Sequence, residues 1–310
     1  MDILKETNLQ NIGPKKIGKV RDIYEQPDRF IFVTTDRHSS FDRIIAHIPW
    51  KGQVLNQISG YWFEHTKDIV PNHLIALPDP NVTVGKKCTP VKIEGVVRGY
   101  LTGVTDTAIW TRYEKGTREF GGVTLPDGMK KNQKLPQAIF DPTTKEDSHD
   151  RTLTPSEMIA EGFVTAEMFA RVQDVSLKLF ARGREMAAEK GLILVDTKYE
   201  FGVDEAGTLT VIDEMHTPDC SRFWQLDSYE ERFLSAEEPQ YFDKEFLRLW
   251  FKENCDPYKD AELPPAPQEL VDELSRRYIQ MYEQLTGTPF AKGGTPISER
   301  IRRNLHSYEI

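Results

Sequence analysis

Charged residues at strand-like spacing are concentrated between residues 192 and 224. In LILVDTKYEFG (192–202), Asp196, Lys198 and Glu200 alternate with uncharged residues, which predicts a strand carrying all three charges on one face. The four apolar residues that open this run are typical of a strand buried on both faces, where a charge must be paired or coordinating. Lysine binds phosphate and carboxylates bind Mg²⁺, so this pattern suits a nucleotide with its divalent metal. The alternative is a hairpin with a solvated charged face.

A second strand is predicted at Leu209 to Ile212, after a turn at 203–207. If that turn is a simple five-residue loop, Asp196 lies opposite Glu214, and Glu214 shares the face of Lys198. One residue more or less in the loop, or a bulge, would bring Asp213 to that face instead. The sequence therefore does not decide whether Asp213 or Glu214 binds the metal together with Glu200.

Three further groups of cations suit anionic ligands. The segment KKIGKVRDIY (15–24) is predicted to be one basic strand with Lys19 and Arg21 on one face, although its spacing is not that of a P-loop. Arg98 follows two valines and is predicted to be a buried arginine that meets a ligand or an ion-pair partner. Lys244 and Arg248 lie one turn apart on a predicted helix, where they bind an anion or stay solvated.

The remaining pattern predicts helices joined to antiparallel strands. A capping box at Thr154 and Glu157, with Pro155 between them, marks a helix start, and Gly191 marks a helix end. The segment 114–136 is predicted to be a mobile surface excursion, and the basic segment through Arg303 to be peripheral. Helices are predicted at 53–65, 166–190, 241–255 and 268–287, and strands at 30–35 and within 74–100.

Composition excludes several classes of protein. The 310 residues are 38% hydrophobic, which suits a globular enzyme, and their net charge of −9 argues against a general nucleic-acid binder. No run reaches the ~20 apolar residues of a membrane span, and the first residues lack a signal-peptide pattern. Three scattered cysteines indicate neither a zinc site nor a disulfide framework. We therefore expect a cytoplasmic enzyme that binds neither membrane nor nucleic acid, as a monomer or a homodimer.

Four ordered motifs together resemble the SAICAR synthase family: GKVRDIY (18–24), VVRGYLTG (96–103), LILVDTKYEFG (192–202) and DEMHTPDCSRFW (213–224). The resemblance implies an ATP-dependent ligase of de novo purine biosynthesis that joins CAIR to L-aspartate, giving SAICAR, ADP and phosphate through an acyl phosphate. It also implies an α+β fold with an antiparallel β-rich N-terminal lobe, residues 1–95, and a larger α+β lobe, residues 96–310. ATP would occupy a kinase-like or ATP-grasp-like cleft, with adenine against Pro90 to Glu94.

The resemblance further implies roles for individual residues. Lys198, Arg98 and Asp219 would be catalytic, and Glu200 with Asp213 would hold Mg²⁺. ATP would contact Gly18, Lys19, Arg21, Lys145, Lys198 and Glu200, and CAIR would contact Arg98, Asp219, Ser221, Arg222, Lys244 and Arg248. His149 and Asp150 match a family loop beside the site.

Val104 departs from the family pattern, so a hydroxyl contact to CAIR would come from Thr102 or Thr105 or be absent. Cys220 also departs from it, which implies that no hydroxyl chemistry is needed at that position. Asp36, Ser39 and Lys51 could hold aspartate or serve the structure alone. A small-molecule kinase and a nucleotide-sensing module remain the rival functions.

Overall fold

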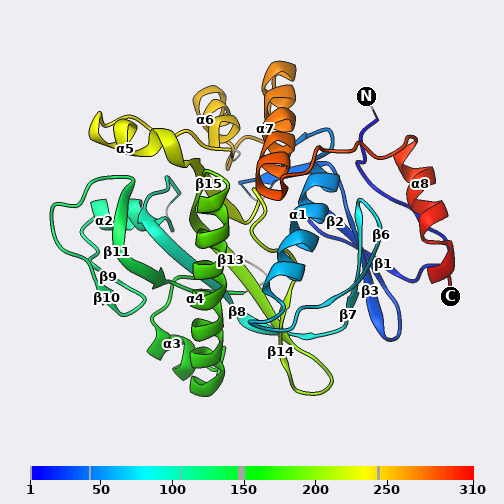
Figure 1. The fold of residues 1–310 in the computed structure, drawn as a ribbon, viewed down its shortest axis with the longest axis horizontal. Helices are drawn as coiled ribbons and strands as arrows, with labels where there is room; N and C mark the ends of the chain where they lie inside the picture. The colour runs from blue at the N-terminus through cyan, green and yellow to red at the C-terminus, as the bar shows by residue number, and fades with distance from the viewer. Residues whose placement is uncertain (1, 42, 106, 146–150, 243–244) are drawn as a thin grey trace.

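Two antiparallel sheets organise the computed structural model, which describes residues 2–41, 43–105, 107–145, 151–242 and 245–310 (Figure 1). The smaller sheet has five strands in the order β1 (Lys15–Ile17), β2 (Arg21–Glu25), β3 (Arg29–Thr34), β7 (Val82–Lys86) and β6 (Leu74–Asp79). The larger has the order β11 (Gln133–Phe140), β8 (Thr89–Leu101), β13 (Leu192–Val203) and β14 (Leu209–Ile212), with β12 (Thr143–Thr144) on β8 and β15 (Ser221–Gln225) on β13. The predicted α+β class with antiparallel sheets is confirmed.

Two further hairpins lie outside these sheets: β4 (Arg37–Ser40) with β5 (Arg43–His47), and β9 (Glu119–Phe120) with β10 (Val123–Thr124). The helices are α1 (Lys51–Thr66), α2 (Ile109–Glu114), α3 (Pro155–Ala160), α4 (Ala166–Glu189), α5 (Leu226–Leu234), α6 (Glu245–Asn254), α7 (Gln268–Thr286) and α8 (Ile297–Asn304), followed by the short 3₁₀ turn η1 (His306–Tyr308). In the described part of the chain, no helix has the length and apolar character to cross a bilayer.

Local sequence signals account for where several helices begin and end. The predicted capping box opens α3, with Thr154 accepting from the backbone of Glu157 and the Glu157 side chain accepting in return. Helix α4 ends at Glu189, and the predicted end residue Gly191 follows the cap Lys190 with a φ of +70°, which glycine readily adopts. The predicted helix at 241–255 begins only at residue 245 within the described chain.

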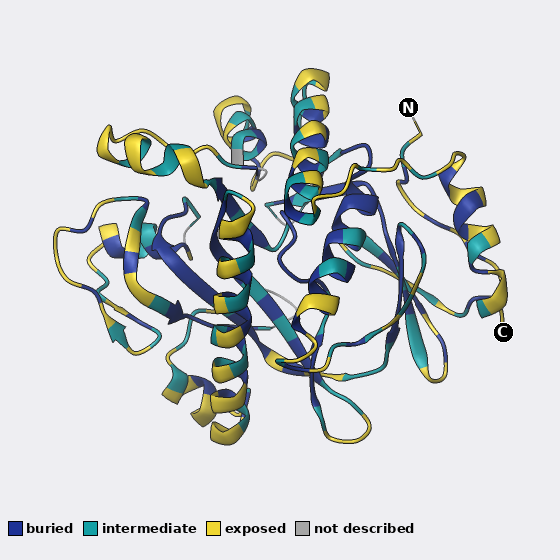
Figure 2. Cartoon of the chain, viewed as in Figure 1, coloured by how far each residue is buried: buried dark blue, intermediate teal, exposed yellow. Residues whose placement is uncertain are grey.

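The main hydrophobic core lies between the larger sheet and its helices. Helix α4 crosses one face of β8 and β13 (Figure 1), and its residues Phe169, Val172 and Phe180 are buried there. Figure 2 shows β8 and β13 buried along most of their length, whereas the outer side of α4 is exposed. The core also includes α1 and α7, so the side chains of β13 are held on a rigid support.

Strand β13 has hydrogen-bonded neighbours along both edges. One edge pairs with β8, and the other pairs first with β15 and then with β14. Asp196 is therefore opposite Arg98 on β8 and Arg222 on β15. The simple loop at 203–207, which would set Asp196 opposite Glu214, is not formed, because Val203 pairs with Leu209 and β14 ends at Ile212, opposite Glu200.

Two segments predicted to be peripheral are packed. The segment 114–136 folds over a small core that includes Phe120, Leu125 and Leu135, and is not an open excursion. Helix α8 packs on the smaller sheet through Ile297 and Ile301. Both predictions were wrong because the apolar residues responsible are interspersed among glycine and charged residues, which dominate the local pattern.

We propose that the two sheets define the two lobes, divided between β7 and β8. A boundary at residue 95 falls inside the continuous strand β8. Helix α8 also returns to the first sheet, where Arg300 pairs with Asp79 at 2.9 Å. The N-terminal lobe is therefore built from both ends of the described chain.

Candidate active site

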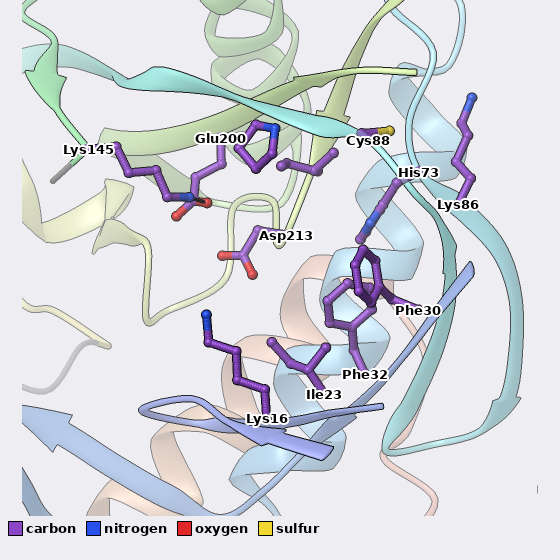
Figure 3. A pocket seen from close by; sticks show the side chains of 12 residues that line it. Lys16, Ile23, Phe30, Phe32, His73, Lys86, Cys88, Lys145, Glu200 and Asp213 are labelled. Carbon is purple, nitrogen blue, oxygen red and sulfur yellow. Dashed lines mark hydrogen bonds and ion pairs between the residues drawn. The ribbon is translucent and has the colours of Figure 1, made fainter. Parts of the chain in front are cut away.

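A cavity of about 340 Å³ lies between the two sheets (Figure 3). Ile23, Phe30 and Phe32 line it from the smaller sheet, and Pro90 and Ile212 from the larger. Its other walls include Cys88, Lys86 and His73, and its polar residues include Lys16, Lys145, Glu200 and Asp213. An apolar slot with charges to one side suits a flat base followed by phosphates.

Lys198 and Lys145 converge on Glu200 beside this cavity. Lys198 Nζ donates to Glu94 Oε1 at 2.8 Å and to Glu200 Oε1 at 3.2 Å. Lys145 donates to the second Glu200 oxygen, as Figure 3 shows. Burial lowers the pKa of Lys198, but the charge and hydrogen bond of Glu94 outweigh it and leave the pKa raised. Lys198 is therefore a positive charge held between two carboxylates.

Arg21 joins the two carboxylates between which the sequence could not decide. Its guanidinium lies 2.5 Å from Asp213 Oδ1 and 3.3 Å from Glu214 Oε1. Thr217 donates its hydroxyl to the other Glu214 oxygen. Burial raises the pKa of Asp213, but Arg21, Lys198 and Lys145 outweigh it and leave the pKa lowered. Both carboxylates thus have a cation as partner.

Backbone geometry brings Asp213 into the cavity. Continued alternation along β14 would have placed Glu214 on the Lys198 face, but the strand ends at Ile212 and Asp213 has a φ of +70°. Among the described residues, Asp213 lines the cavity with Glu200, and Glu214 is not part of that lining. The sequence pattern gave no sign of this change of direction.

The segment 15–24 is a hairpin and not the single strand that was predicted. Lys15 to Ile17 pair with Asp22 to Tyr24, and the Gly18 N–H donates to the Arg21 carbonyl at 2.8 Å. Lys19 is exposed in the connecting turn. Lys19 and Arg21 therefore do not alternate along one strand face, and Lys16, which was not predicted, lines the cavity from β1.

A second, polar cavity of about 160 Å³ lies further along β13. Its lining brings together four predicted CAIR residues, Asp219, Ser221, Arg222 and Arg248, with Asp196, Pro218 and Cys220. Arg222 pairs with Asp196 at 2.5 Å, and Arg248 Nε donates to Ser40 Oγ at 3.2 Å. Of the other residues assigned by resemblance, Lys244, His149 and Asp150 lie outside the described residues.

Lys51 is a buried ion-pair partner of Asp219, which lines this second cavity. Its side chain is 0% exposed, and its Nζ lies 2.6 Å from Asp219 Oδ2. Tyr278 OH donates to the other Asp219 oxygen at 3.0 Å. The sequence raised Lys51 only as a possible aspartate contact and did not indicate Tyr278, which comes from α7, far away in the chain.

Arg98 was predicted to meet either a ligand or an ion-pair partner, and in the structure it has an ion-pair partner. Its Nε lies 2.8 Å from Asp141 Oδ2, which also accepts from Arg112 at 2.8 Å. Neither Arg112 nor Asp141 was predicted. Asp141 immediately follows β11, so the partner of Arg98 comes from the neighbouring strand.

Two buried histidines near the site are neutral at pH 7. Burial lowers the pKa of His73 to about 4 and that of His216 to about 3. His73 lines the nucleotide-sized cavity, and His216 shares a 2.5 Å hydrogen bond with Tyr199. Neither ring supplies a positive charge to the site.

The His73 pKa predicts acid sensitivity of the fold. Between pH 6.5 and 4 the unfolded chain binds a proton at this position that the folded chain does not, so stability falls as pH falls. The loss attributable to His73 is about 3 kcal/mol. Urea unfolding across this pH range should show a shallower dependence in His73→Gln, and an unchanged slope would contradict the assignment.

Comparison with known proteins agrees with this geometry. The family model of SAICAR synthetase matches residues 15–265. A phosphoribosylaminoimidazole-succinocarboxamide synthase from Legionella pneumophila (strain Paris) is 54% identical over 307 residues, covering 98% of each chain. A SAICAR synthase from Saccharomyces cerevisiae, solved in complex with SAICAR, is 33% identical with a TM-score of 0.78, covering 93% of this chain and 100% of that one. A SAICAR synthetase solved with ADP, at 22% identity and a TM-score of 0.69, covers 90% and 100% and supports the fold alone.

By its fold and family match, the chain falls in a class of α+β ATP-dependent ligases. The chain belongs to the SAICAR synthase family, whose members are ATP-dependent ligases of purine biosynthesis.

Proposed function

We propose that this chain condenses CAIR with L-aspartate to form SAICAR while ATP is converted to ADP and phosphate. One observation carries the proposal: the two cavities lie along one face of β13. Glu200 lines the first and Asp196 the second. These residues are four apart, which is roughly 13 Å along a strand. Base and triphosphate in the first cavity would thus extend toward a substrate in the second.

ATP is assigned to the first cavity. Phe30, Phe32 and Ile212 supply apolar walls for adenine, and the charged side meets the phosphates. Lys198 and Lys145 supply positive charge where the γ-phosphoryl group leaves ADP. A CAIR carboxylate oxygen attacks the γ-phosphorus and ADP departs. The aspartate amine then attacks the acyl carbon and expels phosphate.

Mg²⁺ is assigned to Glu200 and Asp213. Both carboxylates line one cavity wall, and the described residues contain no cluster of three or more potential metal ligands. Two carboxylates fit Mg²⁺, which keeps waters and takes phosphate oxygens as further ligands. When bound, the ion would neutralise charge on the transferring phosphoryl group.

CAIR is assigned to the second cavity. Arg222 and Arg248 provide positive charge for its phosphate, and Ser221 and Asp219 provide polar partners. Arg98 lies opposite Asp196 on the adjacent strand β8, and its guanidinium is held by Asp141.

The direct test supplies purified protein with ATP, Mg²⁺, CAIR and L-aspartate. SAICAR and ADP should form in equal amounts, and only when aspartate is present. ADP formation without an amine acceptor would favour a small-molecule kinase, and binding without turnover would favour a nucleotide sensor.

The metal assignment predicts unequal effects at neighbouring carboxylates. Asp213→Asn should raise the Mg²⁺ concentration for half-maximal turnover at least about tenfold, because ligand loss should cost no less than loss of an outer-shell partner. Glu214→Gln is the matched control and should have a smaller effect, since Asp213 is the residue in the cavity lining. Mg²⁺ titrations of initial rate distinguish them, and the reverse order would assign the metal to Glu214.

A further inference from the structure

The two carboxylates assigned to Mg²⁺ already have protein cations as partners. Arg21 lies 2.5 Å from Asp213, and Lys145 pairs with Glu200. Lys198 lies between Glu200 and Glu94. We call this set the ion cluster; it consists of the cations Arg21, Lys145 and Lys198 and the carboxylates Glu94, Glu200, Asp213 and Glu214. Arg21 and Lys145 therefore each occupy one oxygen of a carboxylate that is assigned to the metal.

The ion cluster is buried at Arg21 and at its carboxylates Glu200 and Glu94, whereas Lys145 and Lys198 are about a third exposed. The side chains of Arg21, Glu200 and Glu94 are 12%, 13% and 8% exposed. Charges in such surroundings interact more strongly than they would in water, and a charge that loses its partner is costly to leave unpaired. A divalent ion that bound alone would displace Arg21 from Asp213, leaving it only the longer contact with Glu214 at 3.3 Å, or would displace Lys145 from Glu200.

A triphosphate changes this balance because it supplies new anionic oxygens. Arg21 released from Asp213 could then pair with phosphate, and Lys145 released from Glu200 could do the same. The displaced cations and the arriving phosphates thus compensate one another. Metal and nucleotide together give each displaced cation a new anionic partner, whereas metal alone takes Glu200 from Lys145 and leaves Arg21 only Glu214.

We propose that Arg21, with Lys145, acts as a resident counter-ion that blocks the metal carboxylates until the nucleotide arrives. The inference rests on the proposed assignment of Mg²⁺ and ATP to this cavity. It makes metal and nucleotide binding mutually dependent, since coupling between two ligands is reciprocal. Arg21 is thus a positioning residue for the metal site in the absence of nucleotide and a phosphate partner in its presence.

The test measures metal and nucleotide binding separately on the full chain. Mn²⁺ binding to nucleotide-free protein is followed by electron paramagnetic resonance, and binding of AMP-PNP at saturating Mn²⁺ by calorimetry. Arg21→Gln should tighten Mn²⁺ binding about tenfold or more by removing a close competing charge. The same substitution should weaken AMP-PNP binding. A merely structural role for Arg21 would weaken both.

Three further variants locate the effect. Arg21→Lys keeps the charge and should leave Mn²⁺ affinity close to that of the original chain. Lys16→Gln removes a charge from the same cavity wall but not from the ion cluster, and should tighten Mn²⁺ binding less. Adding Asp213→Asn to Arg21→Gln should abolish the gain.

Unchanged or weaker Mn²⁺ binding in Arg21→Gln would overturn the inference. If that variant does not fold, Lys145→Gln can be used in its place, because the Lys145 side chain is more exposed. This variant should likewise tighten Mn²⁺ binding, through Glu200. The two proposals fail separately. Lack of SAICAR formation by the original chain would contradict the proposed function, whereas normal turnover without a gain in Mn²⁺ affinity would contradict only the counter-ion role.

Discussion

Replacing Lys198 by methionine is expected to lower kcat/KM for ATP by about 10³-fold. Lys198 donates to Glu94 and Glu200 and provides a fixed charge beside the proposed γ-phosphoryl position. Loss of one preorganised donor to developing negative charge typically costs 10²–10³ in rate. Methionine keeps the length of the apolar stem and removes the charge, so steady-state rates report the electrostatic contribution.

A matched variant separates this effect from general instability. Lys178→Met makes the same substitution on the exposed surface of α4, where Lys178 pairs with Asp174 one turn away. Such exposed pairs contribute little to stability, so activity should be unchanged. Thermal melts of both variants show whether Lys198→Met remains folded. Activity within tenfold of the original in a folded Lys198→Met protein would contradict the assigned role.

Replacing Asp219 by alanine is expected to destabilise the fold by about 3–5 kcal/mol. The change leaves the Lys51 ammonium, which is 0% exposed, without its carboxylate. It also removes the acceptor of the Tyr278 hydroxyl. Urea unfolding monitored by tryptophan fluorescence measures the loss, and the KM for CAIR should rise in the same variant because Asp219 lines the second cavity.

A double-mutant cycle distinguishes an unpaired charge from a simple packing defect. Lys51→Met alone leaves Asp219 without its ammonium partner and should also be destabilising. The combined Lys51→Met and Asp219→Ala chain should lose less stability than the sum of the two single changes, because neither charge is then left unpaired. Additive losses would mean that the two side chains do not stabilise each other.

Regular periodicity predicted the elements that carry the site. The alternation of Asp196, Lys198 and Glu200 predicted β13 and its charged face, since a period of two follows from strand geometry alone. The capping box at Thr154 and the glycine at 191 likewise predicted helix ends, because each satisfies local backbone groups. Residues whose role depends on their neighbours in the sequence could thus be predicted from the sequence.

Contacts between segments far apart in the sequence could not be predicted in this way. Arg21 meets Asp213 across 192 residues, and nothing in either local pattern indicates the other. The direction of Asp213 depends on a positive φ after an apparently regular strand, and a side-chain pattern does not record that conformation. Family resemblance supplied the choice of Asp213 that alternation alone would have reversed.

The return of α8 to the first sheet has a consequence for how the chain folds as it is made. Synthesis proceeds from the N-terminus, and domains generally fold as they emerge. The core of the smaller sheet, with Ile31 and Val33, also needs Ile297, Ile301 and Leu305. The first sheet synthesised must therefore wait, with part of one apolar face uncovered, until the 210 residues between Lys86 and Ile297 have followed. During that interval its exposed apolar residues are a binding site for a chaperone.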